Sequence, residues 1–163
     1  MAAASRAHTG VAAPFGARLV ACHAELQQVL DKWADVLAAA AARGVPVRPA
    51  KTLLFVFLAD EVLPHARAEE RTLYRAAQRD PGAALLVQGL VAEHRDLASQ
   101  AERLEAQTRP AAVAATAGVI SNLFASHVAK ENDLLLPALE RCGVDVARLI
   151  AREDRLADLR SVA

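Results

Sequence analysis

The sequence predicts an all-α fold, an up-down-up-down four-helix bundle with a short extra helix at the C-terminal end. Hydrophobic residues, mostly Ala, Leu and Val, make up 54% of the 163 residues, and aromatic residues only 4%. This composition is typical of close-packed helices. Four long segments also carry apolar residues at helical spacing, and turns of about two to six residues join them. With turns this short, each helix has to run antiparallel to the one before it.

Each predicted helix is bounded by Gly or Pro, the residues that most often mark helix ends. The first is followed by Gly44, the second by Asp80-Pro81-Gly82, and the fourth by Gly143. Pro64 and Pro137 fall inside the second and fourth segments and are expected to interrupt them. The four predicted helices span residues 14–43, 49–79, 82–107 and 110–141.

The two ends of the chain are expected to differ. Residues 1–13 contain a mixture of small residues, Gly and Arg, which predicts a disordered tail rather than a signal peptide. Residues 14–163 then form one domain, because the chain is too short for two comfortable cores. Residues 144–163 have the pattern of a shorter helix that packs outside the bundle or frays.

Charge and hydropathy exclude two classes of partner. Lys plus Arg equals Asp plus Glu at 19 each, and no basic block stands out, so nucleic acid is not expected. The longest uncharged apolar run, near residues 53–59, is far shorter than the roughly 20 residues that cross a bilayer. Cys22 and Cys142 form no CxxC pair and fit a reducing compartment. We therefore expect a soluble, cytoplasmic protein.

Four of the five histidines are distributed one to each predicted helix. His23 has Leu19 and Leu26 on the same helical face, and the other three also lie on apolar stripes. All four side chains should therefore point into the bundle. They are His23, His65, His94 and His127.

Two of these histidines have a glutamate four residues later. The pairs are His65 with Glu69 and His127 with Glu131, and side chains at this spacing share one helical face. At about 1.5 Å of rise per residue, His23 and Glu69 lie ~30 Å and ~29 Å from the first turn, and are therefore level. By the same count His94 also lies at this height, whereas the expected height of His127 differs by several residues. Six ligating groups are thus predicted in one slice of the bundle.

A metal site follows from the cost of burying these groups. An unpaired ionised group in a core costs several kcal/mol, and a pair of divalent cations removes this cost by coordination. Imidazole together with carboxylate suits iron, zinc or manganese, and the lack of a Cys ligand argues against a structural zinc site.

The order His, HxxxE, His, HxxxE on consecutive helices resembles the hemerythrin-like (HHE cation-binding) family. Residues 58–74, LADEVLPHARAEERTLY, are similar to its second-helix signature, and residues 123–137, LFASHVAKENDLLLP, to its fourth. The resemblance spans about residues 15 to 141. It implies a non-haem di-iron centre, bridged by an oxo or hydroxo group as well as by two carboxylates. Carried over by position, one iron takes His23 and His65, the other takes His94 and His127, and Glu69 and Glu131 bridge them.

The sequence departs from the oxygen-carrying members of this family at two places. Ala98 stands where they have a second histidine in the third helix, and Glu131 follows the last histidine by four residues where they have an Asp after five. The resulting set of four His and two Glu is similar to that of di-iron proteins linked to iron–sulfur cluster repair. Losing one ligand leaves room at both irons, which favours reaction with O₂, nitric oxide or peroxide over reversible oxygen carriage.

Five nearby polar residues are not expected to be ligands. Glu61 could orient an imidazole, although a solvated ion pair is the simpler interpretation. The Tyr74 side chain should pack in the core with its hydroxyl outward. The other three flank ligands in the sequence and should therefore face away from the centre, and these are Glu70, Glu93 and Asp133.

Three functions remain open at this point. The protein could bind a diatomic molecule as a binding or sensing module, or act as an enzyme that consumes peroxide or nitric oxide or supplies iron for cluster repair. It could also be a bundle that a metal pair merely stabilises. The small-molecule partner, the native metal and the oligomeric state are not fixed by the sequence.

Overall fold

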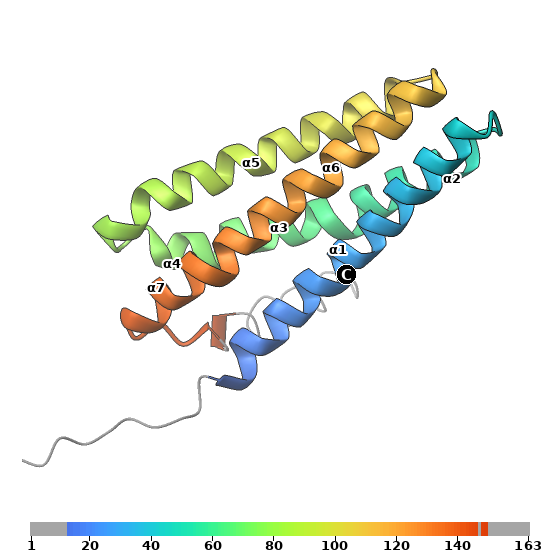
Figure 1. Ribbon diagram of the computed structural model, residues 1–163. Coiled ribbons are helices and arrows are strands. Elements are labelled where there is room, and N and C mark those ends of the chain that lie inside the picture. Colours follow the sequence, from blue (N-terminus) through green and yellow to red (C-terminus); the bar gives the residue numbers. More distant parts are fainter. Residues whose placement is uncertain (1–12, 147, 150–163) are drawn as a thin grey trace, which may run out of the picture.

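Four long helical rods form the protein, as the computed structural model in Figure 1 shows. The structure describes residues 13–146, 148 and 149, and these contain helices and turns without any strand. The four predicted helices are confirmed, with ends that differ by at most two residues from those expected. The alternating direction of the rods stays a prediction.

The first and third rods are single helices, α1 (Ala13–Ala42) and α5 (Pro81–Ala106). The second and fourth rods each contain short π-helical turns, labelled η, in which the backbone hydrogen bonds span five residues. The second rod consists of α2 (Arg48–Phe57), η1 (Leu58–Val62), α3 (Leu63–Glu69), η2 (Glu70–Tyr74) and α4 (Arg75–Ala77). The fourth consists of α6 (Pro110–Lys130), η3 (Glu131–Leu135) and α7 (Leu136–Arg141).

Two of the π-helical turns explain how the rods accommodate their prolines. Pro64 follows η1 and Pro137 follows η3. A proline has no N–H and its ring clashes with the carbonyl four residues earlier. In the wider turns the N–H of the preceding residue instead reaches back five residues, from Leu63 to Leu58 and from Leu136 to Glu131. The predicted interruptions therefore take the form of π-helical turns.

The turns between rods use the expected residues. Gly44 has a φ of +66°, a conformation that residues with a side chain rarely adopt. The carboxylate of Asp80 accepts a hydrogen bond of 2.9 Å from the backbone N–H of Gly82 and so caps the start of α5.

The rods enclose a core that is divided into two apolar clusters. α1 packs along α2 and α6, and α5 also packs along α2 and α6. The first core cluster includes Leu30, Leu37 and Ile120, and the second includes Leu73 and Leu139. Each rod contributes to both clusters and changes from one to the other near its predicted metal ligands.

The stretch Pro110–Arg141, the fourth rod, is by length and composition apolar enough to cross a membrane, so the expectation that the longest such run lies near residues 53–59 is wrong. A core helix of a soluble bundle passes the same test, and this rod packs against both α1 and α5. Its apolar composition is thus accounted for by its place in the bundle. The expectation that the protein has no membrane partner stays a prediction.

The predictions for the two termini fall mainly on residues outside the described ranges. Of the predicted tail, residue 13 belongs to α1. Of the predicted C-terminal helix, Val146 lies buried in the second core cluster.

Replacing Leu37 with Ala tests the core. This side chain is fully buried in the first core cluster, so its truncation should lower the free energy of unfolding by about 2–5 kcal/mol. Urea denaturation measures the change. Leu85, which is 78% exposed, supplies the control, because its replacement with Ala should change stability little.

Candidate metal centre

The six residues predicted as ligands lie together in one layer between the two core clusters. The side chains of five are at most 5% exposed, and that of His65 is 18% exposed. The single helices α1 and α5 supply one residue each, His23 and His94. The second rod supplies His65 and Glu69, and the fourth rod supplies His127 and Glu131.

Glu69 faces histidines from three rods. Its Oε1 lies 3.0 Å from Nε2 of His23 and 3.0 Å from Nε2 of His65. Its Oε2 lies 3.6 Å from Nε2 of His94. The two oxygens of one carboxylate therefore point toward different histidines, as a carboxylate shared by two cations requires.

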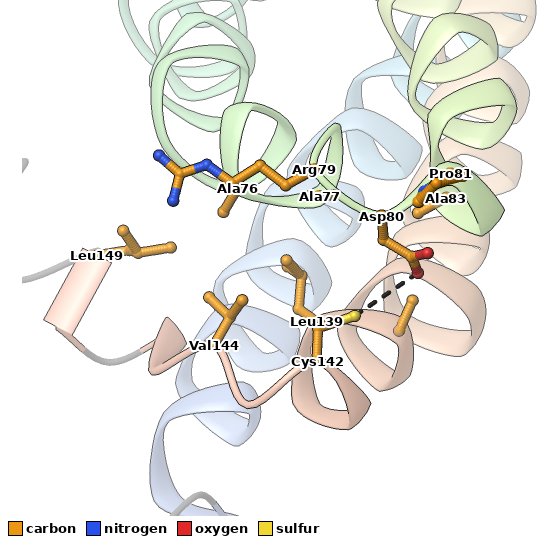
Figure 2. A pocket seen from close by; sticks show the side chains of 11 residues that line it. Ala76, Ala77, Arg79, Asp80, Pro81, Ala83, Leu139, Cys142, Val144 and Leu149 are labelled. Atoms are coloured by element: carbon orange, nitrogen blue, oxygen red, sulfur yellow. Dashed lines mark hydrogen bonds between the residues drawn. The ribbon is translucent and has the colours of Figure 1, made fainter.

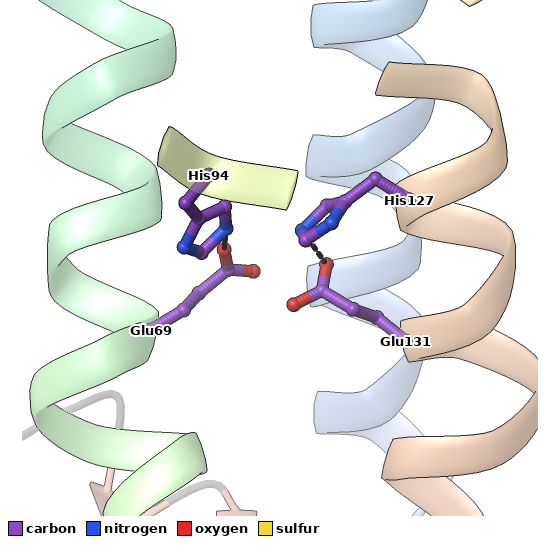
Figure 3. A group of neighbouring side chains, drawn as sticks. All are labelled: Glu69, His94, His127 and Glu131. Carbon is purple, nitrogen blue, oxygen red and sulfur yellow. Dashed lines mark ion pairs between the residues drawn. The ribbon is translucent and has the colours of Figure 1, made fainter. Parts of the chain in front are cut away.

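Glu131 takes a similar position on the opposite side of the layer. Its Oε2 lies 3.5 Å from Nε2 of both His23 and His127. Figure 3 shows the carboxylates of Glu69 and Glu131 extending toward each other between their rods, with His94 and His127 beside them.

Two sets of ligating atoms, each with members no more than 4.8 Å apart, can be separated within this layer. One set contains His23, His65 and Glu69, and the other contains Glu69, His94, His127 and Glu131. Glu69 belongs to both sets. This division agrees with the pairing of histidines that the family resemblance implies.

Two buried atoms of the layer fit a cation better than a hydrogen bond. Nε2 of His65 and Oε2 of Glu131 are both inaccessible to solvent and make no well-oriented hydrogen bond among the described residues, although Nε2 of His65 lies 3.0 Å from Glu69 and Oε2 of Glu131 lies 3.5 Å from His127. Buried polar atoms without partners are rare and costly. Both atoms carry a lone pair that can coordinate a metal, and the set of imidazoles and carboxylates suits iron, zinc or manganese. The residues present therefore fit a pair of cations.

Protons balance the charges of this layer when no metal is bound. Burial alone lowers the pKa of His65, but its contacts with Cys22 and Glu69 outweigh burial and raise it to about 10. Burial likewise opposes the charge on Glu69, yet its close contacts with His23, His65 and His94 hold its pKa well below the usual range. The imidazoles of His65 and His127, whose pKa values are both raised, thus act as cations for the buried carboxylates.

Side chains on neighbouring rods hold the outer nitrogens of two histidines. Nδ1 of His23 lies 2.9 Å from Oδ1 of Asn132, and Nδ1 of His94 lies 2.9 Å from Oε1 of Glu70. A hydrogen on Nδ1 leaves Nε2 free to bind a metal. These contacts therefore fix each ring in the orientation that the layer needs.

The other two histidines are held in the same manner. Nδ1 of His127 lies 3.0 Å from Oε2 of Glu93, whose second oxygen accepts a hydrogen bond of 2.5 Å from Lys130. The imidazole of His65 forms a hydrogen bond with the side chain of Cys22.

The prediction that Glu70 and Glu93 face away from the centre is therefore wrong. A side chain that flanks a ligand leaves its own helix at a different angle, but in this bundle it meets a histidine of the next rod. The sequence does contain a signal for these contacts, because polar residues stand beside the predicted ligands in helices that are otherwise apolar. Glu61 and Asp133 are exposed, so the prediction for Asp133 is confirmed.

The prediction that Tyr74 packs in the core is confirmed, but the prediction that its hydroxyl points outward is wrong. Its side chain is 1% exposed, and its hydroxyl donates a 2.6 Å hydrogen bond to Oε1 of Glu131. The hydroxyl oxygen of Tyr74 also lies 3.4 Å from Nε2 of His94 and 3.3 Å from Nε2 of His127. The π-helical turn η2 explains the error, since five residues in such a turn return to the face from which Glu69 projects.

The hydroxyl of Tyr74 changes the expectation of open space at both irons. It lies 3.4 Å from Nε2 of His94 and 3.3 Å from Nε2 of His127, within reach of the place at which these two histidines would hold a cation. Burial and the charge of Glu131 raise the pKa of Tyr74, so the hydroxyl stays protonated and donates. The room left by the missing seventh ligand is thus partly filled.

A cavity of about 590 Å³ lies at one end of the bundle, as Figure 2 shows. Its wall is mostly apolar, with Arg79, Asp80 and Cys142 as its polar members, and the thiol of Cys142 donates to the Asp80 carboxylate at 3.6 Å. None of the six residues of the layer contributes to this wall. The cavity is therefore separate from the candidate metal centre.

Four imidazoles and two carboxylates, buried in one layer of an all-helical protein, define a cation-binding helical domain. The family of the hemerythrin HHE cation-binding domain matches residues 16–139, and the chain belongs to this family. Membership implies that the domain binds metal ions, and the His/Glu layer is a group of residues that could hold them. No curated protein and no solved structure matches the chain.

Replacing Tyr74 with Phe tests the hydroxyl. The variant keeps the ring but removes a buried hydrogen bond to a carboxylate, which should lower the free energy of unfolding of the metal-free protein by roughly 1.5–3 kcal/mol. The loss should be smaller after metal is added, since a cation then satisfies Glu131. Urea denaturation with and without metal measures both values. Equal losses would show that the hydroxyl acts independently of the metal.

The pKa of His65 gives a prediction for pH. Its value is raised from 6.5 to about 10 in the folded metal-free protein, so it contributes stability that is complete below pH 6.5 and is lost as the pH rises toward 10. The midpoint of urea unfolding of chelator-treated protein should therefore fall across this range. In a His65→Gln variant this component should be absent, and an identical pH dependence in both proteins would contradict the assignment.

Proposed function

We propose that this chain is an up-down-up-down four-helix bundle that holds two iron ions and uses them to bind or react with a small molecule, namely O₂, nitric oxide or peroxide. The observation that carries the proposal is the sharing of the Glu69 carboxylate. One of its oxygens lies 3.0 Å from two histidines, and the other faces a third histidine at 3.6 Å. A shared carboxylate is the natural link between two cations.

The number of ligands supports reactivity rather than a purely structural metal. Six protein side chains serve two ions, so coordination positions remain for a small molecule, as in catalytic rather than structural metal sites. Iron in this setting supplies redox chemistry and a site of attachment for a diatomic molecule or peroxide. The protein orients the imidazoles through Asn132, Glu70, Glu93 and Cys22, and the two core clusters keep bulk water from the layer.

Measuring metal content together with an absorption spectrum tests the proposal. The spectrum is taken anaerobically and then after O₂, peroxide and nitric oxide in turn. Two irons per chain with a reversible new band in O₂ would indicate a binding protein, and rapid consumption of peroxide or nitric oxide would indicate an enzyme. Two bound metals without any spectral response would leave only a structural role, and a protein without metal would refute the proposal.

The ligand assignment predicts the behaviour of a His65→Ala variant. Loss of this imidazole should remove about one metal per chain and lower the melting temperature of the metal-loaded protein, because a ligand of one position is lost. Elemental analysis and thermal denaturation measure both effects. The matched control replaces His8, the one histidine that is not a predicted ligand, and should change neither the metal content nor the melting temperature. Full metal occupancy in the His65 variant would refute the assignment.

A further inference from the structure

The two histidine pairs of the layer differ in the groups that hold their outer nitrogens. On one side, Nδ1 of His94 and Nδ1 of His127 each face a carboxylate, at 2.9 Å from Glu70 and 3.0 Å from Glu93. The Nδ1–H of a ligating imidazole that donates to a carboxylate makes the imidazole a more basic ligand. This pair is therefore supported by negative charge.

The other pair is held without a carboxylate. Nδ1 of His23 donates to the amide oxygen of Asn132 at 2.9 Å, and the imidazole of His65 forms a hydrogen bond with the side chain of Cys22. An amide orients a ring as a carboxylate does, but it adds no charge beside the cation. The two histidine pairs therefore differ in the side chains that hold them and not in the type of ligand.

Lys130 reduces this difference without removing it. Its ammonium group lies 2.5 Å from Oε1 of Glu93, while Oε2 of the same carboxylate faces His127. The partners of His94 and His127 together with Lys130 then carry two negative charges and one positive charge. Asn132, the partner of His23, carries none. The excess negative charge stays on the side of His94 and His127.

From this asymmetry, and on the basis of the proposed function, we propose that the two metal positions are inequivalent. The position of His94 and His127 takes the first divalent cation and holds it tightly, whereas the position of His23 and His65 takes the second cation and holds it weakly. Glu69 belongs to both sets of ligating atoms and Glu131 to the set of His94 and His127, so the carboxylates do not cancel the difference.

The exposure of the ligands agrees with this division of roles. The side chain of His65 is 18% exposed, whereas those of His23, His94 and His127 are 1%, 5% and 1% exposed. The Tyr74 hydroxyl also covers the side of His94 and His127, at 3.4 and 3.3 Å from their Nε2 atoms. The weaker position thus contains the histidine that is most exposed to solvent.

Titration of the metal-free protein with cobalt(II) under anaerobic conditions tests the inference. Cobalt is a suitable probe because its visible absorption reports coordination, and a competing chelator gives each dissociation constant. The wild-type protein should show two steps whose dissociation constants differ by about 10-fold or more. His65→Ala should keep the tight step, and His94→Ala should lose it. Two equal steps, or a tight step that persists in His94→Ala, would overturn the inference.

Conservative variants test the cause of the inequivalence. Glu70→Gln and Glu93→Gln keep the hydrogen-bond geometry but remove a charge, and each should weaken the tight step by about 10- to 100-fold. Asn132→Asp adds a charge to the other pair and should strengthen the weak step. Glu61→Gln is the matched control, since this exposed carboxylate precedes His65 by one turn, and neither step should change.

The outcomes separate this inference from the proposed function. A protein that binds no cobalt would contradict both. Two cobalt ions that bind with equal affinity would leave the di-metal centre intact and refute only the inequivalence. Two unequal steps that do not respond to Glu70→Gln, Glu93→Gln or Asn132→Asp would also refute it, because the charge of the partners would then not be the cause.

Discussion

The balance of charge in one buried layer is the constraint on which the rest of this structure depends. Glu69 and Glu131 lie almost fully buried, and a carboxylate in such a place is stable only beside a positive partner. Without metal, protonated imidazoles supply that partner, which is why the pKa values of His65 and His127 are raised although burial opposes it. A cation would bind to the same lone pairs. Protons and metal ions therefore compete for one set of atoms, and metal binding must release protons.

The π-helical turns adapt the rods to this layer. η2 begins directly after Glu69, and η3 begins at Glu131, so both irregular turns border a ligating carboxylate. Such turns are frequent at functional sites because the extra residue shifts the side chains that follow. Here the shift brings Tyr74 onto the face of Glu69 and lets it reach Glu131 on another rod. A regular helix through the same residues would have directed that hydroxyl elsewhere.

Sequence patterns were sufficient for the helices and for the convergence of the six residues, because a His/Glu pair at four-residue spacing on an apolar stripe has one direction to face. They were insufficient for the groups that surround the layer. Glu70, Glu93 and Asn132 leave their helices beside a ligand, and only the neighbouring rod decides whether they meet solvent or a histidine. The direction of the Tyr74 hydroxyl was predicted wrongly for another reason, since the prediction assumed a regular α-helix where the chain forms a π-helical turn. The metal-binding role of the six residues stays a prediction.

The division of the core into two apolar clusters has a consequence for cooperativity. Leu37 and Leu139 belong to different clusters, and the polar layer is the boundary between them. Apolar contacts join residues within each cluster, whereas the boundary between the clusters is formed by polar side chains from all four rods. Whatever occupies the layer therefore decides whether the two ends of the bundle unfold as a single unit or as two, one before the other.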